Sequence, residues 1–231
     1  MADLRSLGTR GLSLDRIATI ARYKLGQTLY FQTQQADFWY WIVSGGAREC
    51  SLTAEGRRQI VDFLLPGDLF GLCRGDVRKV TCEIIGGPTT VVCYPRSQAE
   101  ALANGDPQVA RWVREMAFRA IERLQARIVL LGRNRALEKI CGFLLEMEAR
   151  SAARLGEPFP LPMSRYDIAD YLAVAVETVS RTLTALRQQG AITLLAARRV
   201  QINDHRLFRR QYGAGVPTAG APQQAASGSS L

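Results

Sequence analysis

The order of apolar and polar residues changes character near residue 105 of this 231-residue chain. Between about residues 24 and 94, short runs of β-branched and aromatic residues alternate with turns that contain glycine or proline, a pattern typical of strands. From residue 106 onward, apolar residues recur at spacings of three and four, which is typical of helices. The pattern therefore predicts an α+β protein with a strand-rich part followed by a mainly helical part.

The strand-rich part contains six separate runs. Turns at Gly45-Gly46, Pro66-Gly67-Asp68 and Gly86-Gly87-Pro88 separate several of them. Many short strands at near-regular spacing favour a barrel or a jelly roll. The predicted strands cover residues 28–32, 38–44, 48–53, 58–65, 80–85 and 89–94, with a short helix before them at 12–22 and another after them at 96–103.

The longest helical pattern begins at Asp106-Pro107 and runs to about Leu131. Aspartate is a preferred N-cap, and proline suits the first helical position. A helix of about 25 residues spans roughly 37 Å, which is too long for a small strand domain to cover. We therefore expect it to pair with its copy in a second chain, the alternative being a helix packed only within its own chain. The expected dimer stripe is Val109, Val113, Met116, Ala120, Leu124, Ile128 and Leu131.

A break at Gly132 ends this helix, and the next helix is predicted to begin near Arg135. A loop at 150–162, punctuated by proline and glycine, then leads to two short helices joined by a tight turn. Ser164 followed three residues later by Asp167 predicts the start of the first short helix.

The second short helix has two chemically distinct sides. Its expected buried side is formed by Val176, Val179, Leu183 and Leu186. Its opposite side carries Glu177, Ser180, Arg181 and Thr184. A rigid helix with a carboxylate, a hydroxyl and a guanidinium on one side fits the DNA major groove, so we interpret it as a recognition helix. The alternative is the solvated face of an ordinary amphipathic helix pair.

A predicted wing follows Gly190, which is expected to end the recognition helix. Residues 191–195 and 200–202 are expected as two strands, with arginines at the turn between them and a last helix at 205–212. Arginines at such a tip contact phosphates, which position a protein on DNA without reading its sequence. The alternative is a solvated arginine pair. The predicted contacts to the DNA backbone are Ser164, Arg165, Thr178, Thr184, Arg198 and Arg199.

These residues also carry a family resemblance. The segment DIADYLAVAVETVSRTLTALRQQGAI resembles the helix-turn-helix of the Crp/Fnr family of bacterial transcription regulators, and VETVSR within it resembles the Fnr/FixK branch. In that branch a Glu, a Ser and an Arg at this spacing read a TTGAT half-site, which implies base contacts by Glu177, Ser180 and Arg181. The sequence departs from the family at Ala175, where a Ser or Thr usually caps the helix, and at Ala173, where Gly is usual.

The resemblance covers about residues 15–210 and implies a domain organisation. A cyclic-nucleotide-binding-like β-roll would occupy residues 12–105, a dimerisation helix 106–132 and a winged helix-turn-helix 135–212. The implied function is a homodimeric transcription activator that binds a TTGAT-N4-ATCAA-like palindrome and contacts RNA polymerase. Residues 213–231 are small and uncharged, so we expect a disordered tail, for which a role as a degradation tag is open.

The phosphate-binding segment of the β-roll departs from the nucleotide-binding members. Those members have a Glu soon after the equivalent of Gly71 and then an Arg-Ser pair, whereas this chain has Leu72-Cys73-Arg74 and, as the nearest match to the pair, Lys79-Val80. A cyclic phosphate needs a bidentate cation and converging donors, so we expect no bound nucleotide. The alternative is a ligand- or redox-gated sensor whose effector binds the roll, with Cys73 and Cys82 as the thiols concerned.

Composition adds support and excludes other classes. A net charge of +9 suits an anionic partner such as double-stranded DNA. The five cysteines are scattered without a CxxC, which argues against a disulfide framework or a zinc site. No cysteine precedes Cys50, so the N-terminal cysteines that hold the iron–sulfur cluster of Fnr are missing. The single histidine, His205, leaves little for haem or zinc and is expected at a surface or interface. We therefore expect no cofactor.

Targeting and catalytic signals are missing from the sequence. No apolar run approaches the roughly 20 residues needed to span a bilayer, and the first residues lack the apolar core of a signal peptide. We therefore expect a cytoplasmic protein without a membrane partner. No nucleophile, metal or dinucleotide fingerprint of an enzyme is present, so we expect no enzyme.

Overall fold

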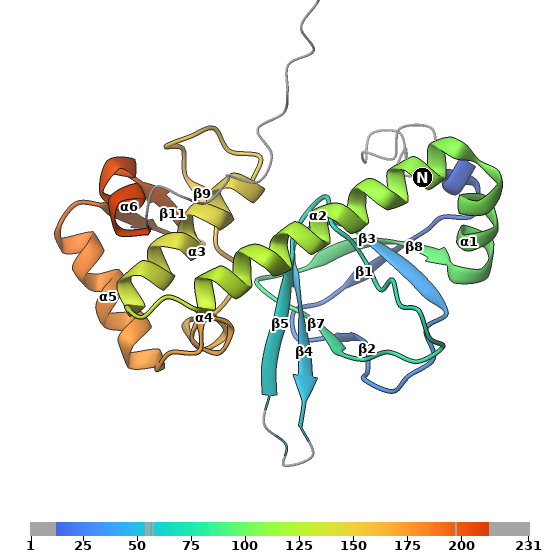
Figure 1. Cartoon of the computed structure of the whole chain (residues 1–231), viewed down its shortest axis with the longest axis horizontal. Helices are drawn as coiled ribbons and strands as arrows, with labels where there is room; N and C mark the ends of the chain where they lie inside the picture. Colours follow the sequence, from blue (N-terminus) through green and yellow to red (C-terminus); the bar gives the residue numbers. More distant parts are fainter. Residues whose placement is uncertain (1–12, 54–55, 57, 197, 213–231) are drawn as a thin grey trace, which may run out of the picture.

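Two lobes of different character are joined by the long helix α2 (Pro107–Leu131), as Figure 1 shows. The structure, a computed structural model, describes residues 13–53, 56, 58–196 and 198–212. One lobe is built mainly of strands and the other mainly of helices, which confirms the predicted α+β class. The expectation of a disordered tail concerns residues 213–231, which lie outside the described residues.

The strand-rich lobe is a roll of two four-stranded antiparallel sheets, ordered β1-β8-β3-β6 and β2-β7-β4-β5. All six predicted strands are present, and their ends differ from the prediction by at most two residues. Tyr40, Ile42 and Phe70 from one sheet pack against Tyr30, Leu64 and Ile84 from the other. The strands are β1 (Thr19–Tyr23), β2 (Thr28–Tyr30), β3 (Phe38–Ser44), β4 (Ala47–Leu52), β5 (Arg58–Leu64), β6 (Leu69–Phe70), β7 (Thr81–Ile84) and β8 (Thr89–Pro95).

The helix expected at residues 12–22 is wrong. Ser13–Arg16 forms one 3-10 turn, and Thr19–Tyr23 is strand β1, paired antiparallel with β8. Thr19 and Ile20 are β-branched and favour extended backbone when a partner strand is available. The partner comes from about seventy positions further along the chain, so local periodicity could not reveal it.

Helix α1 (Arg96–Gly105) leads directly into α2. The side chain of Asp106 caps α2 by accepting a hydrogen bond from the Gln108 backbone N–H at 2.9 Å, as the Asp-Pro start predicted. The N-terminal half of α2 lies against the roll, where Val109 and Met116 join a buried cluster with Trp41 and Tyr94. Val109 and Met116 are therefore buried within their own chain, which corrects their assignment to the dimer stripe.

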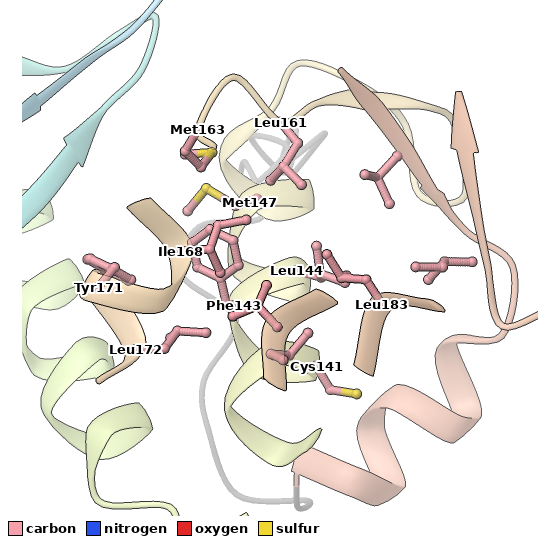
Figure 2. Close-up of a cluster of buried hydrophobic side chains, with 14 of the residues drawn as sticks. Cys141, Phe143, Leu144, Met147, Leu161, Met163, Ile168, Tyr171, Leu172 and Leu183 are labelled. Atoms are coloured by element: carbon pink, nitrogen blue, oxygen red, sulfur yellow. The ribbon is translucent and has the colours of Figure 1, made fainter. Parts of the chain in front are cut away.

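The helical lobe packs four helices and a small sheet around one core. Figure 2 shows Phe143 and Leu144 of α3 beside Ile168 and Tyr171 of α4 and Leu183 of α5. The sheet is antiparallel and ordered β10-β11-β9. The elements are α3 (Ala136–Arg150), β9 (Phe159–Pro160), α4 (Arg165–Leu172), α5 (Val176–Gln188), β10 (Ile192–Leu195), β11 (Arg199–Ile202) and α6 (His205–Tyr212).

Within residues 13–212, apart from positions 54, 55, 57 and 197, no helix combines the length and apolar character needed to cross a bilayer.

Candidate nucleic-acid interface

Helix α4 starts with a reciprocal pair of hydrogen bonds. The Asp167 backbone N–H donates to the Ser164 hydroxyl at 3.1 Å, and the Ser164 backbone N–H donates to the Asp167 carboxylate at 2.9 Å. This capping box satisfies two backbone donors that the first turn would otherwise leave unpaired. The Ser164 hydroxyl is thus already bonded within the chain, whereas the neighbouring Arg165 is exposed.

The turn between α4 and α5 carries both departures that the sequence marked. Ala173 has φ 50° and ψ 56°, a left-handed conformation that costs a residue with a Cβ roughly 1–2 kcal/mol. Ala175 precedes α5 without a side-chain cap. Lys139 of α3 supports the turn, because its Nζ donates to the Leu172 carbonyl at 3.1 Å. Packing from outside the motif therefore stabilises a turn that its own sequence does not favour.

The two sides of α5 differ as predicted. Val179, Leu183 and Leu186 are buried in the core of the lobe. Glu177 and Arg181 on the opposite side are exposed, with Ser180 and Thr184 partly exposed. A shallow depression of about 260 Å³ lies along this outer side, lined by Ser180, Arg181, Thr184, Ala185 and Gln188.

Gln188 is a residue of this outer side that sequence reasoning missed. It lies four positions after Thr184 and seven after Arg181, so helical spacing alone could have found it. Its amide can donate and accept a hydrogen bond, as adenine recognition requires.

The polar groups on the outer side of α5 lack partners among the residues that the structure describes. Among the described residues, no hydrogen bond or ion pair involves the side chains of Glu177, Ser180 or Arg181. A guanidinium carries five N–H donors in a planar fork. Exposed and unpaired on a rigid helix, such a group can bind the O6 and N7 atoms of guanine in the major groove.

The wing arginines lie closer to the protein than expected. Arg198 has φ 55° and donates from Nη1 to the Pro162 carbonyl at 2.8 Å, while Arg199 belongs to β11 and donates from Nη2 to the Pro158 carbonyl. Both side chains are exposed, but each uses part of its fork to tie the wing to the loop that precedes α4. Their remaining N–H groups stay available for an anion.

The interior of the β-roll is occupied by the chain's own side chains. Arg78 is 3% exposed and donates to the carbonyls of Gly71 and Phe38, at 2.5 Å each. Its guanidinium carbon lies 4.4 Å from the centre of the Tyr30 ring, which stacks on Tyr40. Sequence comparison placed the cationic position of the phosphate-binding segment at Lys79-Val80, so the buried cation at Arg78 was missed.

The thiols of the roll differ in exposure. Cys82 is fully buried, and this burial raises the pKa of its thiol well above the ordinary value, which disfavours the reactive thiolate. Cys73 is partly exposed and donates to the Gly75 carbonyl at 3.0 Å. In the part of the chain that the structure describes, no group of three or more His, Cys, Asp and Glu side chains is arranged to hold a metal ion.

His205 is partly exposed and lies where α6 meets α3. Its Nε2 lies 2.8 and 3.0 Å from the two carboxylate oxygens of Glu148, whose side chain is 5% exposed. The contact ties the first turn of α6 to α3. The histidine was expected at a surface or interface, and it lies partly exposed at the contact between these two helices.

Comparison with known proteins agrees with this geometry. The family model for the cyclic nucleotide-binding domain matches residues 20–106, and that for the Crp-like helix-turn-helix domain matches residues 138–210. The nitrogen fixation regulation protein FixK of Azorhizobium caulinodans is 39% identical over 198 residues, which cover 84% of this chain and 79% of that protein. The chain belongs to the Crp/Fnr family.

Two further proteins are similar to this chain, one in sequence and one in both sequence and structure. The transcriptional activator protein FnrL of Cereibacter sphaeroides is 33% identical over 199 residues, covering 83% of this chain and 79% of that protein. The structure of FixK2 from Bradyrhizobium japonicum superposes with a TM-score of 0.79 at 37% identity, covering 87% of this chain and all of that one. The chain is thus a FixK-like, DNA-binding transcription regulator of the Crp/Fnr family.

Proposed function

We propose that this regulator is a homodimeric transcription activator that binds a TTGAT-N4-ATCAA-like palindrome through α5. The observation that carries the proposal is the outer side of α5. There Glu177 and Arg181 are exposed, Ser180 is partly exposed, and none of the three has a side-chain partner within the described part of the chain, while the inner side is buried. The activating role is supported by the relative FnrL, which is named a transcriptional activator. Contact with RNA polymerase and a cytoplasmic location belong to the same proposal.

Each polar group of α5 has a chemically matched target. Arg181 would donate two hydrogen bonds to a guanine, Glu177 would accept from the amino group of cytosine or adenine, and Ser180 would touch the neighbouring base pair or its thymine methyl group. The DNA backbone would be contacted around this face. The residues proposed for that role are Ser164, Arg165, Thr178, Thr184, Arg198 and Arg199. The Ser164 hydroxyl also accepts a hydrogen bond from the Asp167 backbone.

The dimer would form along the C-terminal half of α2. Large apolar side chains on this half are exposed: Phe118 by 57%, Ile121 by 48%, Leu124 by 42% and Ile128 by 70%. An apolar stripe of this size on one helix marks an interaction surface. From the predicted stripe we keep Leu124 and Ile128 at its centre, with Val113, Ala120 and Leu131 partly covered by their own chain.

Dimer symmetry would set the target geometry. Pairing two copies of α2 would place two recognition helices in successive major grooves, about 34 Å apart. The proposed organisation is a β-roll over residues 12–105, a dimerisation helix over 106–132 and a winged helix-turn-helix over 135–212.

We propose that the roll works without a cyclic nucleotide or an iron–sulfur cluster. Arg78, the cation suited to a phosphate, is already bonded to two backbone carbonyls and covered by Tyr30. A redox-gated regulator is the second candidate. Cys73 favours it, since this thiol is partly exposed and lies 3.9 Å from Nη1 of Arg96.

Fluorescence anisotropy with labelled palindromic DNA tests the proposal. The untreated protein is expected to bind with a Kd in the range of about 10⁻⁸–10⁻¹¹ M at physiological salt and at least ~10³-fold more weakly to a scrambled duplex. Added cyclic nucleotide should leave the Kd unchanged. Equal binding to both duplexes would contradict sequence-specific reading, and a Kd that responds to reductant or oxidant would favour the redox-gated candidate.

A further inference from the structure

The β-roll and the helix-turn-helix share one apolar core. Phe63 of β5 packs against Tyr171 of α4 and Phe143 of α3, with ring centres 4.9 and 6.1 Å apart. Pro162, in the loop before α4, lies so close to Gly86 that a Cβ on this glycine would come within 2.3 Å of the proline Cβ. Domains within one chain usually meet through smaller, more polar and mobile contacts. A continuous core here indicates a fixed angle between the two lobes.

Asp167 of α4 connects the two lobes through its separate carboxylate oxygens. Oδ2 accepts from the backbone and hydroxyl of Ser164, which caps α4. Oδ1 accepts from Nη1 of Arg48 on β4 and, at 3.5 Å, from Nη2 of Arg58 on β5. The Asp167 side chain is 4% exposed, so this pairing is largely shielded from water and salt. The first turn of the helix-turn-helix, at the start of α4, is thus bonded directly to the roll.

Further bonds fix the arginines and the next turn of α4. Arg48 is oriented by Glu83 of β7, whose Oε2 accepts from Nε at 2.9 Å and from Nη2 at 2.7 Å. Arg58 donates to Asp170 at 3.0 Å, and Gln59 donates to the Asp170 carbonyl at 2.8 Å. One sheet of the roll therefore forms hydrogen bonds with two successive turns of α4.

The same roll is tied to the helix that we propose as the dimer axis. Arg123 of α2 and Arg150 of α3 both bind Asp68, at 3.1 and 2.8 Å, and Arg123 also binds Asp62 of β5 at 3.2 Å. Arg127 of α2 donates to the Ile60 and Val61 carbonyls and covers the Tyr171 ring at 4.5 Å. A continuous set of bonds therefore runs from α2 through the roll to α4.

We infer that Arg48 and Arg58 are positioning residues that fix the half-site spacing accepted by the dimer. The inference rests on the proposed function, since it needs two readers on one palindrome. Helices α4 and α5 pack together in one core. The position of α4 against the roll therefore sets the direction of each recognition helix. Because both rolls are fixed to the paired α2 helices, the distance between the two recognition helices is fixed as well.

Binding to palindromes of different spacer length tests this inference. Each added base pair moves one half-site by about 3.4 Å and rotates it about the DNA axis, so a rigid dimer must discriminate against the change. The wild-type protein is expected to prefer the four-base-pair spacer over a six-base-pair spacer. In the double variant Arg48→Gln/Arg58→Gln, the ratio of the two Kd values is expected to fall about tenfold. The Kd for a single half-site should stay unchanged.

Two matched variants separate positioning from loss of charge or folding. Arg22→Gln removes an exposed arginine of β1 and should keep the wild-type spacing preference. Reversing the partly exposed pair, Arg58→Asp with Asp170→Arg, should restore most of the preference that Arg58→Asp alone loses. A preference unchanged in the double glutamine variant, or no rescue by reversal, would overturn the inference. Wild-type protein that binds no palindrome would overturn the proposed function and this inference together.

Discussion

The interior of the β-roll and the outer side of α5 each contain an arginine, and the two arginines differ in burial and in hydrogen bonding. Arg78 is buried in the roll, bonded to two carbonyls and covered by an aromatic ring. Arg181 on α5 is exposed and has no partner among the described residues. A site that awaits a ligand leaves its polar groups open, whereas buried polar groups are satisfied by the chain itself. Two of the three Arg78 nitrogens are satisfied by the chain, while Nε has no partner among the described residues. On this contrast we propose that α5 is the binding surface and that the roll is a structural support.

The same contrast divides helix α2. Its N-terminal half is closed against the roll by Val109 and Met116, while its C-terminal half exposes Ile121 and Ile128. The apolar residues of this amphipathic helix therefore fall into two groups, and we propose a different partner for each. The first is the chain's own roll, and the second, in our proposal, is another copy of the chain.

Replacing Arg78 tests the closed character of the roll and should give the largest effect. Arg78→Met keeps a long side chain but leaves two buried carbonyls without donors, so the free energy of unfolding should fall by about 3 kcal/mol. DNA affinity well below the melting temperature should stay unchanged. Thermal unfolding and anisotropy measure the two quantities. The exposed neighbour Lys79→Met is the control, and an equal loss of stability in both variants would contradict the account.

A charge on the exposed half of α2 tests its assignment as the dimer surface. Ile128→Glu would place two carboxylates in an apolar contact, so we expect the dimer dissociation constant to rise about 100-fold, or about 2.7 kcal/mol. Sedimentation velocity reports the dimer, and binding to the palindrome should weaken with it. Gln108→Glu adds the same charge at the other end of α2 and should leave the dimer intact. A dimer that tolerates Ile128→Glu would place the contact elsewhere.

Truncation of Arg181 tests the open character of α5. Arg181→Ala should cost roughly 1–3 kcal/mol of binding to the palindrome, with relaxed preference at the paired guanine, and should leave unfolding unaffected. Arg187→Ala removes an exposed arginine from the last turn of the same helix and serves as the control. Identical affinity losses in both variants would mean that only charge matters at this surface.

The buried carboxyl of Glu49 in the roll predicts a smaller, pH-dependent effect on stability. Desolvation raises the pKa of the Glu49 carboxyl from its ordinary 4.5 to about 7, so the folded protein keeps this proton where the unfolded chain releases it. Glu49 therefore makes stability fall as pH rises from about 4.5 to about 7. Glu49→Gln cannot ionise, so its stability relative to the wild type should increase by about 1–2 kcal/mol between pH 5 and pH 8. Thermal unfolding at both values measures it, and a constant difference would refute the assignment.

Local pattern was enough for the parts of the fold that depend on neighbours in sequence. The bounds of α2 and α5, the capping box at Ser164 and the two sides of α5 follow from spacing and capping rules. The resemblance to the Crp/Fnr family then implied which residues form the proposed DNA-reading surface. These predictions need no knowledge of distant contacts.

Distant contacts account for the errors and omissions. Strand β1 exists because β8 pairs with it, and β9 has only two residues, too few to show a period. Arg78, Arg198 and Arg199 were not expected to bind backbone carbonyls, because those carbonyls come from other segments of the chain. The sequence shows which side chains are charged, but it does not show which of them form hydrogen bonds with other parts of the folded chain.

The most direct test of the central claim is a hydroxyl-radical footprint of the untreated protein on a TTGAT-N4-ATCAA palindrome. Two readers on one dimer should protect two symmetric regions whose centres lie one helical turn apart, about 34 Å. Arg181→Ala should weaken both regions together. Protection of a single half-site, or none without an added ligand, would contradict a dimer that reads DNA through α5.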